Sequence, residues 1–105
     1  MTDKRIVLST AGSQDGARKL AQQLVEQQLA ACVNIIPHIE SVYRWQGKME
    51  SSTEWLLLIK TTQEKSPAVR DAIRQLHSYE LPECISLAIE DGSAPYLDWI
   101  AQSVK

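Results

Sequence analysis

Apolar residues recur along the chain with two different spacings, and the shorter spacing is typical of strands. Five apolar runs rich in β-branched residues predict strands, and they span residues 5–11, 32–36, 39–46, 49–62 and 84–89. The second and third runs are separated only around Pro37, so we interpret them as one strand with a bulge or bend. Gly47 offers a turn before the fourth run. The middle of the chain is therefore expected to form one long hairpin.

The longer spacing of apolar residues predicts three helices. The first follows Ser13, a plausible N-cap, and runs to about Leu29. The second begins with Ser66 as its cap, directly before a proline, and ends near His77. A short last helix can be capped by Ser93, and the residues that share one of its faces are Tyr96, Trp99 and Ile100.

The resulting order of elements is β-α-β-β-α-β followed by a C-terminal helix. This order is the ferredoxin-like split βαβ pattern, an α+β fold in which both long helices cover one face of a four-stranded antiparallel sheet. No linker, repeat or low-complexity segment interrupts the 105 residues. We therefore expect a single domain over residues 1–105.

One strand fits a lone domain of this kind badly. In the run WLLLI, the residues Trp55, Leu57 and Ile59 should face one side of the sheet, and Leu56 and Leu58 the other. Both faces of this strand are apolar, yet the helices can cover only one of them. The pattern predicts an oligomer in which the uncovered sheet faces pack together.

The hairpin should also reach beyond the helices. A strand over residues 49–62 extends roughly 45 Å at ~3.3 Å per residue, whereas the second helix spans only ~17 Å. The overhanging tip carries Tyr43, Trp45 and Met49. Exposed aromatic residues on a protruding arm suggest contacts with neighbouring subunits or a docking surface for other proteins.

Composition and charge exclude several classes of function. The net charge of −2 and the pI of about 5.6 do not favour nucleic acid as a partner. No apolar run approaches the ~18 residues of a membrane span, and the start of the chain lacks a signal-peptide core. We expect a cytoplasmic protein in which Cys32 and Cys84 form no disulfide.

The residues that could support chemistry are few. The chain has no GxSxG, HExxH or Gly-rich phosphate motif, so we do not expect an enzyme. Cys32 lies in an apolar strand start and is interpreted as a buried thiol rather than a nucleophile. The two histidines and two cysteines show no ligand spacing within one element. A metal site assembled between chains stays open.

The loop LHSYELPEC, residues 76–84, follows the second helix at a sheet edge. Lys60 is expected at the nearby end of the third strand. We expect Lys60, His77 and Glu83 to be able to converge in a cleft between subunits, where the lysine could hold an anion. The alternative is an ordinary polar loop beside an exposed strand-end lysine.

Several segments together resemble the CutA family, the divalent-cation tolerance proteins. The segments LAACVN, SVYRWQGKMES, EWLLLIKTT, HSYELPE and YLDWI carry the resemblance, and they occupy residues 29–34, 41–51, 54–62, 77–83 and 96–100. They follow one another with the spacing of the family across essentially the whole chain.

The resemblance implies a ferredoxin-like subunit in a homotrimer, similar in architecture to PII signalling proteins. It also implies a link to copper and other divalent cations, with His77 and Cys32 as candidate metal ligands. The positions that match the presumed inter-subunit pocket of the family are Cys32, Tyr43, Trp45, Glu54, Lys60, His77, Tyr79 and Glu83. Of these, Tyr43, Trp45, Glu54, Lys60, Tyr79 and Glu83 are expected to bind a ligand.

The chain departs from the family pattern at three positions. Ser78 replaces a proline, and Ser9 and Leu76 stand where some copper-binding relatives carry a cysteine and a second histidine. Only His77 remains of that set. We therefore expect a trimeric metal-homeostasis protein that binds copper weakly. Alternatives are a PII-like module that binds a small anion through Lys60, and a trimeric scaffold that docks proteins by its hairpin tips.

Overall fold

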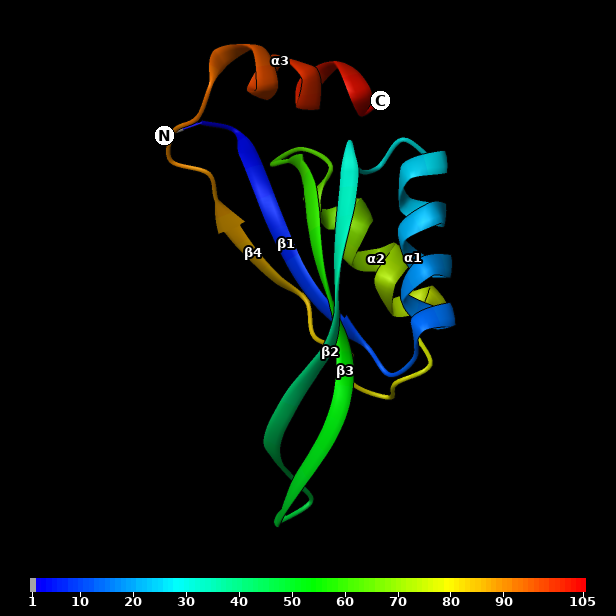
Figure 1. The fold of residues 1–105 in the computed structure, drawn as a ribbon. Helices are drawn as coiled ribbons and strands as arrows, with labels where there is room; N and C mark the ends of the chain where they lie inside the picture. Colours follow the sequence, from blue (N-terminus) through cyan, green and yellow to red (C-terminus); the bar gives the residue numbers. More distant parts are fainter. Residues whose placement is uncertain (1) are drawn as a thin grey trace.

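Four strands and three helices make up the protein in the computed structural model, which describes residues 2–105 (Figure 1). In chain order the elements are β1 (Lys4–Ala11), α1 (Gln14–Glu26), β2 (Cys32–Trp45), β3 (Lys48–Thr62), α2 (Ser66–Leu76), β4 (Ile85–Ala88) and α3 (Ala94–Ser103). This is the predicted order. Within residues 2–105, no helix has the length and apolar character needed to cross a membrane.

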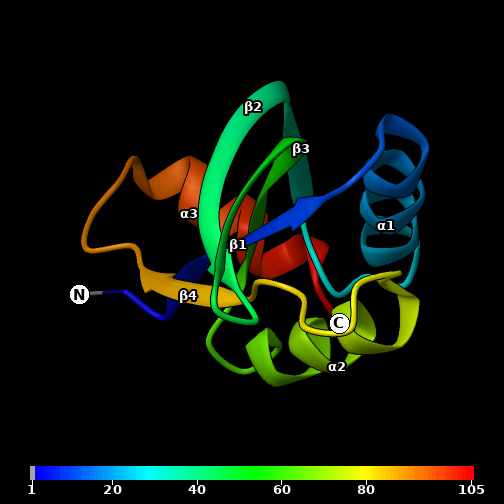
Figure 2. The same cartoon turned by 90° about the horizontal axis from the view of Figure 1, so that it is seen from below.

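The strands form one antiparallel sheet in the order β2-β3-β1-β4. Helices α1 and α2 lie side by side against one face of it, and α3 lies across the end where β1 begins and β3 ends (Figures 1 and 2). The predicted α+β ferredoxin-like fold with a C-terminal helix is confirmed. Strand β3 is central, because it pairs with β2 along one edge and with β1 along the other.

The core fills the space between the sheet and helices α1 and α2. Its large buried side chains are Val7, Leu57 and Ile59 from the sheet, Leu20 and Leu24 from α1, and Val69 and Ile73 from α2. Alternation along the strands places every second side chain toward the helices. Burying one such side chain fully stabilises the fold by about 1.5–3 kcal/mol.

The other face of the sheet is also apolar. Leu56 and Leu58 are only half-buried there, as the alternation in WLLLI predicted, whereas Leu57 and Ile59 are completely buried. Leu8 lies between Leu58 on β3 and Ile85 on β4 in the strand register. We call this surface, opposite α1 and α2, the open face. Helix α3 covers part of it, near one end (Figure 1).

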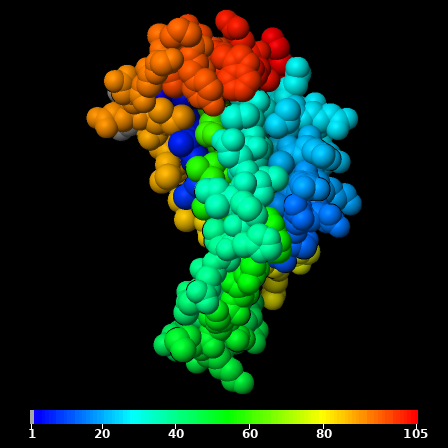
Figure 3. Space-filling view, in the orientation of Figure 1, coloured from blue at the N-terminus to red at the C-terminus, as the bar shows by residue number. Residues whose placement is uncertain are grey.

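Strands β2 and β3 continue beyond the helices as a twisted two-stranded arm (Figures 1 and 3). The predicted overhang is confirmed, as is the bulge at Pro37. The strand register shifts between Ile36 and Ile39, so that Pro37 and His38 together lie opposite Trp55, and His38 has a φ of 58°. At the arm's tip Gly47, with a φ of 80°, supplies the left-handed conformation that a tight hairpin turn requires.

Helix α1 ends at Glu26, three residues earlier than predicted. The stop is a Schellman motif, in which the Leu29 amide donates to the Leu24 carbonyl and the Gln28 amide to the Val25 carbonyl. Gln28 takes the left-handed conformation, with a φ of 59°, that glycine usually supplies at this position. The sequence therefore lacked the usual stop signal.

Two further element boundaries were predicted wrongly. Ser66 is not the cap of α2, because Lys65 holds that position without a side-chain hydrogen bond. The Ser66 hydroxyl instead pairs with the Ser86 hydroxyl at 3.4 Å. Strand β4 is shorter than predicted, since it pairs with β1 over four residues only. The predicted cap of α3 is correct, because the Ser93 hydroxyl accepts from the Tyr96 amide.

The core predicts how two substitutions in α2 should differ. Ile73→Ala removes a fully buried side chain and should lower the free energy of unfolding by about 2–5 kcal/mol. Leu76→Ala, in the same helix, removes a side chain that is 45% exposed, and should cost less than about 1 kcal/mol. Urea denaturation followed by circular dichroism measures both. Equal losses would contradict the assigned core.

Candidate functional site

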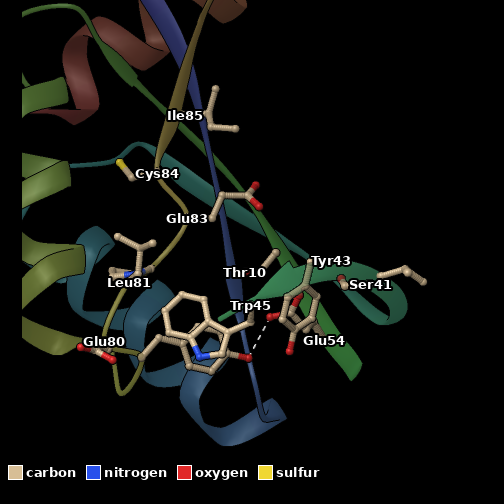
Figure 4. A pocket seen from close by; sticks show the side chains of 13 residues that line it. Thr10, Ser41, Tyr43, Trp45, Glu54, Glu80, Leu81, Glu83, Cys84 and Ile85 are labelled. Carbon is tan, nitrogen blue, oxygen red and sulfur yellow. Dashed lines mark hydrogen bonds between the residues drawn. The ribbon is translucent and has the colours of Figure 1, made fainter. Parts of the chain in front are cut away.

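A cavity of about 750 Å³ lies on the open face, between the base of the arm and the loop that joins α2 to β4 (Figure 4). Five of the six residues predicted to bind a ligand line this cavity: Tyr43, Trp45, Glu54, Tyr79 and Glu83. They come from the hairpin strands β2 and β3 and from the loop, which lies well after the hairpin in the sequence. The structure therefore brings most of the predicted set together within one subunit.

The bulge in β2 decides that Tyr43 and Trp45 reach this side of the sheet. Before the bulge, even-numbered residues of β2 pair with even-numbered residues of β3, as Ile36 does with Leu56. After it, odd-numbered residues take that place, so that Ile39 pairs with Glu54. Because paired residues project to the same face, the extra residue turns both aromatic rings toward the open face, where Glu54 also lies.

Glu54 and Tyr79 form the floor of the cavity. The Tyr79 hydroxyl donates to Oε2 of Glu54 at 2.8 Å, and Glu54 is only 8% exposed. Burial, together with this hydrogen bond and the negative charge of Glu54, raises the pKa of Tyr79 to about 12. Tyr79 is therefore a neutral donor at physiological pH. A side chain at Gly12 would come within 2.8 Å of the Tyr79 hydroxyl, so glycine leaves room for this contact.

His77 holds Tyr79 in place. Its Nδ1 accepts from the backbone amide of Tyr79 at 3.0 Å, and its Nε2 therefore donates to the Thr10 carbonyl. The two rings also pack against each other at a tilt of 48°, with centroids 4.5 Å apart. Both ring nitrogens are occupied by the protein itself. To bind a metal, as the sequence predicted, His77 would have to release one of these partners.

Lys60 and Cys32 lie away from the cavity. Cys32 on β2 pairs with Lys60 on β3. Lys60 lies six residues after Glu54 along β3, which corresponds to roughly 20 Å. Lys60 donates to the side-chain oxygen of Asn34, and Cys32 contacts the Tyr96 hydroxyl at 3.6 Å. That contact, with some burial, raises the pKa of Tyr96. The expected convergence of Lys60 with His77 and Glu83 does not occur within one subunit.

The predicted ligand-binding set omitted part of the lining, although Glu80 and Cys84 belong to the loop that the sequence had singled out. The additional residues are Thr10, Ser41, Val42, Glu80, Leu81, Pro82, Cys84 and Ile85. Most of them neighbour a predicted residue in the loop or on β2, so their proximity in sequence was an available signal. Thr10 had no such signal, since only its pairing opposite Leu56 brings it there. Burial raises the pKa of the Cys84 thiol, while Arg70 and Arg74 act in the opposite direction.

Metal ligands are sparse within a single chain. Across residues 2–105, no group of three or more histidine, cysteine, aspartate or glutamate side chains is placed to hold an ion. The cavity contains carboxylates but no lysine, arginine or histidine among its lining residues. Its charge thus favours a cation over the small anion that was considered from the sequence.

Comparison with known proteins identifies the family. Residues 5–103 match the family model described as CutA1 divalent ion tolerance protein. The chain is 44% identical over 100 residues to the divalent-cation tolerance protein CutA of Thermus thermophilus, which covers 95% of this chain and 97% of that protein. It is 51% identical over 88 residues to the CutA homolog of Xenopus laevis, but covers only 58% of that longer relative.

Solved structures agree with the sequence comparison. The crystal structure of CutA from Xylella fastidiosa superposes with a TM-score of 0.97 at 38% sequence identity, and the match covers 99% of this chain and 100% of that one. The resemblance seen in the sequence is thereby confirmed. The chain belongs to the CutA family of divalent-cation tolerance proteins.

Proposed function

We propose that this protein acts in divalent-cation tolerance as a cytoplasmic, non-enzymatic homotrimer that binds copper(II) or a similar ion weakly. Family membership supports the link to divalent cations, since the relatives are named as tolerance proteins and not as enzymes. The two cysteines are free, in keeping with a reducing compartment. The observation that carries the assembly is the apolar open face.

The open face is too apolar for a lone subunit. Ile85 and Leu87 on β4 are 49% and 46% exposed, and they continue the half-buried row of Leu8 and Leu58. A contiguous apolar surface of this kind marks an interface. Packing such faces around a threefold axis would cover them and produce a closed assembly.

A bound metal ion would have to be held either by ligands from more than one subunit or by very few ligands. Cys32 pairs with Lys60 on β3, and Lys60 pairs in turn with Ile6 on β1. His77 contacts the carbonyl of Thr10, which lies four residues after Ile6 along β1. This separation of roughly 13 Å prevents the two side chains of one chain from sharing an ion. An ion held by both would take them from different subunits, and an ion held by one would bind weakly.

Charge on the open face should separate the subunits. We expect a trimer for the unaltered protein, and we expect Leu58→Asp to convert it largely to monomers, because a buried unpaired carboxylate costs several kcal/mol. Val25→Asp, at a 42% exposed position of α1, is the matched control and should remain trimeric. Native mass spectrometry measures the assembly, and circular dichroism checks folding. A monomeric unaltered protein would refute the proposed trimer.

Copper uptake tests the metal half separately. In native mass spectrometry with copper(II), the trimer should gain up to about one ion per chain. His77→Ala and Cys32→Ser should each weaken binding by about tenfold or more, whereas His38→Ala, in the bulge of β2 and not among the predicted metal ligands, should not change it. A trimer that takes up no copper would refute the metal assignment but not the proposed trimer.

A further inference from the structure

The arm has a second face, which points away from the open face. After the bulge the odd-numbered residues of β2 lie on the open face, so the even-numbered residues Glu40, Val42 and Arg44 lie on the opposite side. Ser51 and Met49 of β3 pair with Val42 and Arg44 and share that side. We call this surface the back face of the arm. Helices α1 and α2 lie on the same side of the sheet, but the arm extends past both of them (Figures 1 and 3).

The back face is apolar at its centre. Met49 is 77% exposed and Val42 is 65% exposed, and together with Leu81 they are the most exposed large apolar side chains within residues 2–105. Val42 also lines part of the cavity. Because the back face lies opposite the open face, packing the open faces together in the proposed trimer turns the back faces outward. An apolar surface in that position marks a further interface.

The charges beside Val42 make the back face complementary to itself. Glu40 lies two residues before Val42, and Arg44 lies two residues after it on the same side of the strand. Two such strands can face each other in opposite directions about a twofold axis through Val42. Each Arg44 then meets the Glu40 of the second copy, and the two Val42 side chains meet between them. Within residues 2–105, neither Glu40 nor Arg44 takes part in an ion pair.

The size of the back face indicates how many arms must act together. About five residues on each of two strands cover roughly 16 Å by 10 Å. One pair of arms therefore falls well below the ~1,000 Å² that a specific interface needs. Three arms that belong to one trimer can engage three arms of a second trimer at once, and this multivalency strengthens the contact. A twofold axis perpendicular to the threefold axis makes the two sets of arms run in opposite directions, as the charge pattern requires.

We propose that two trimers pair through the back faces of their antiparallel arms and form a hexamer. Val42 and Met49 supply the apolar contact, and Glu40 and Arg44 of opposing copies form ion pairs at its two ends. The self-complementary charges favour a second copy of this chain over an unrelated protein as the occupant. The inference rests on the proposed trimer, to which it adds a second interface, and it does not involve a metal ion.

Sedimentation velocity over a series of protein concentrations tests the pairing. EDTA is present, so that no metal ion can bridge two trimers. We expect trimers to associate into hexamers as the concentration rises, and added salt to weaken this association. A protein that stays trimeric at every concentration would overturn the pairing but not the proposed trimer. A monomeric protein would refute the trimer and the hexamer together.

Charge variants identify the contact. Arg44→Glu makes both members of each ion pair negative, and Glu40→Arg makes both positive, so each should weaken the association of trimers by at least tenfold. The double variant Glu40→Arg/Arg44→Glu reverses every pair, and should associate within about threefold of the unaltered protein. Arg18→Glu, the same change of charge at an exposed position of α1, is the control and should have no effect.

Mixing the two single variants separates an intermolecular contact from a structural role within the arm. Trimers of Arg44→Glu alone and of Glu40→Arg alone should not pair, whereas an equal mixture should form hexamers that contain one trimer of each kind. Native mass spectrometry identifies the composition, and circular dichroism checks that each variant folds. A mixture of folded variants that stays trimeric, or single variants that still form hexamers, would overturn the assigned contact.

Discussion

The apolar character of β3 on both faces is the constraint on which the rest of the structure depends. Leu57 and Ile59 anchor the helical layer, while Leu56 and Leu58 form the middle of the open face. A strand with one polar face would fix its own orientation, but β3 does not. Its orientation follows from pairing with β1, where Val7 and Ala11 fall on the helical side. Ser9 shares that side, and its buried hydroxyl has no partner within residues 2–105.

The bulge at Pro37 and His38 links this sheet to the cavity. Pro37 cannot donate a backbone hydrogen bond, so a break in the pairing of β2 is favoured there. The break adds one residue to β2, which moves Tyr43 and Trp45 to the face that carries Glu54. One local irregularity therefore determines that the aromatic rings of the arm and the buried carboxylate belong to the same cavity.

A chain of hydrogen bonds then fixes the loop after α2. His77 donates to the Thr10 carbonyl and accepts from the Tyr79 amide. The Tyr79 hydroxyl donates in turn to Glu54. The loop contributes few buried apolar side chains, and Leu81 is 72% exposed. These polar contacts therefore place the loop against the sheet, and His77 serves the cavity through Tyr79 and not as one of its lining residues.

The sequence by itself determined the order of elements, the two-faced strand, the bulge and the overhanging hairpin, because each depends on local periodicity or on a proline or glycine. It also indicated most residues of the cavity through the resemblance to a family. Only the tertiary structure decided that Lys60 and Cys32 lie apart from Glu54, that Thr10 joins the cavity, and that both nitrogens of His77 are occupied. These facts depend on strand register and on contacts between distant segments, which no local pattern encodes.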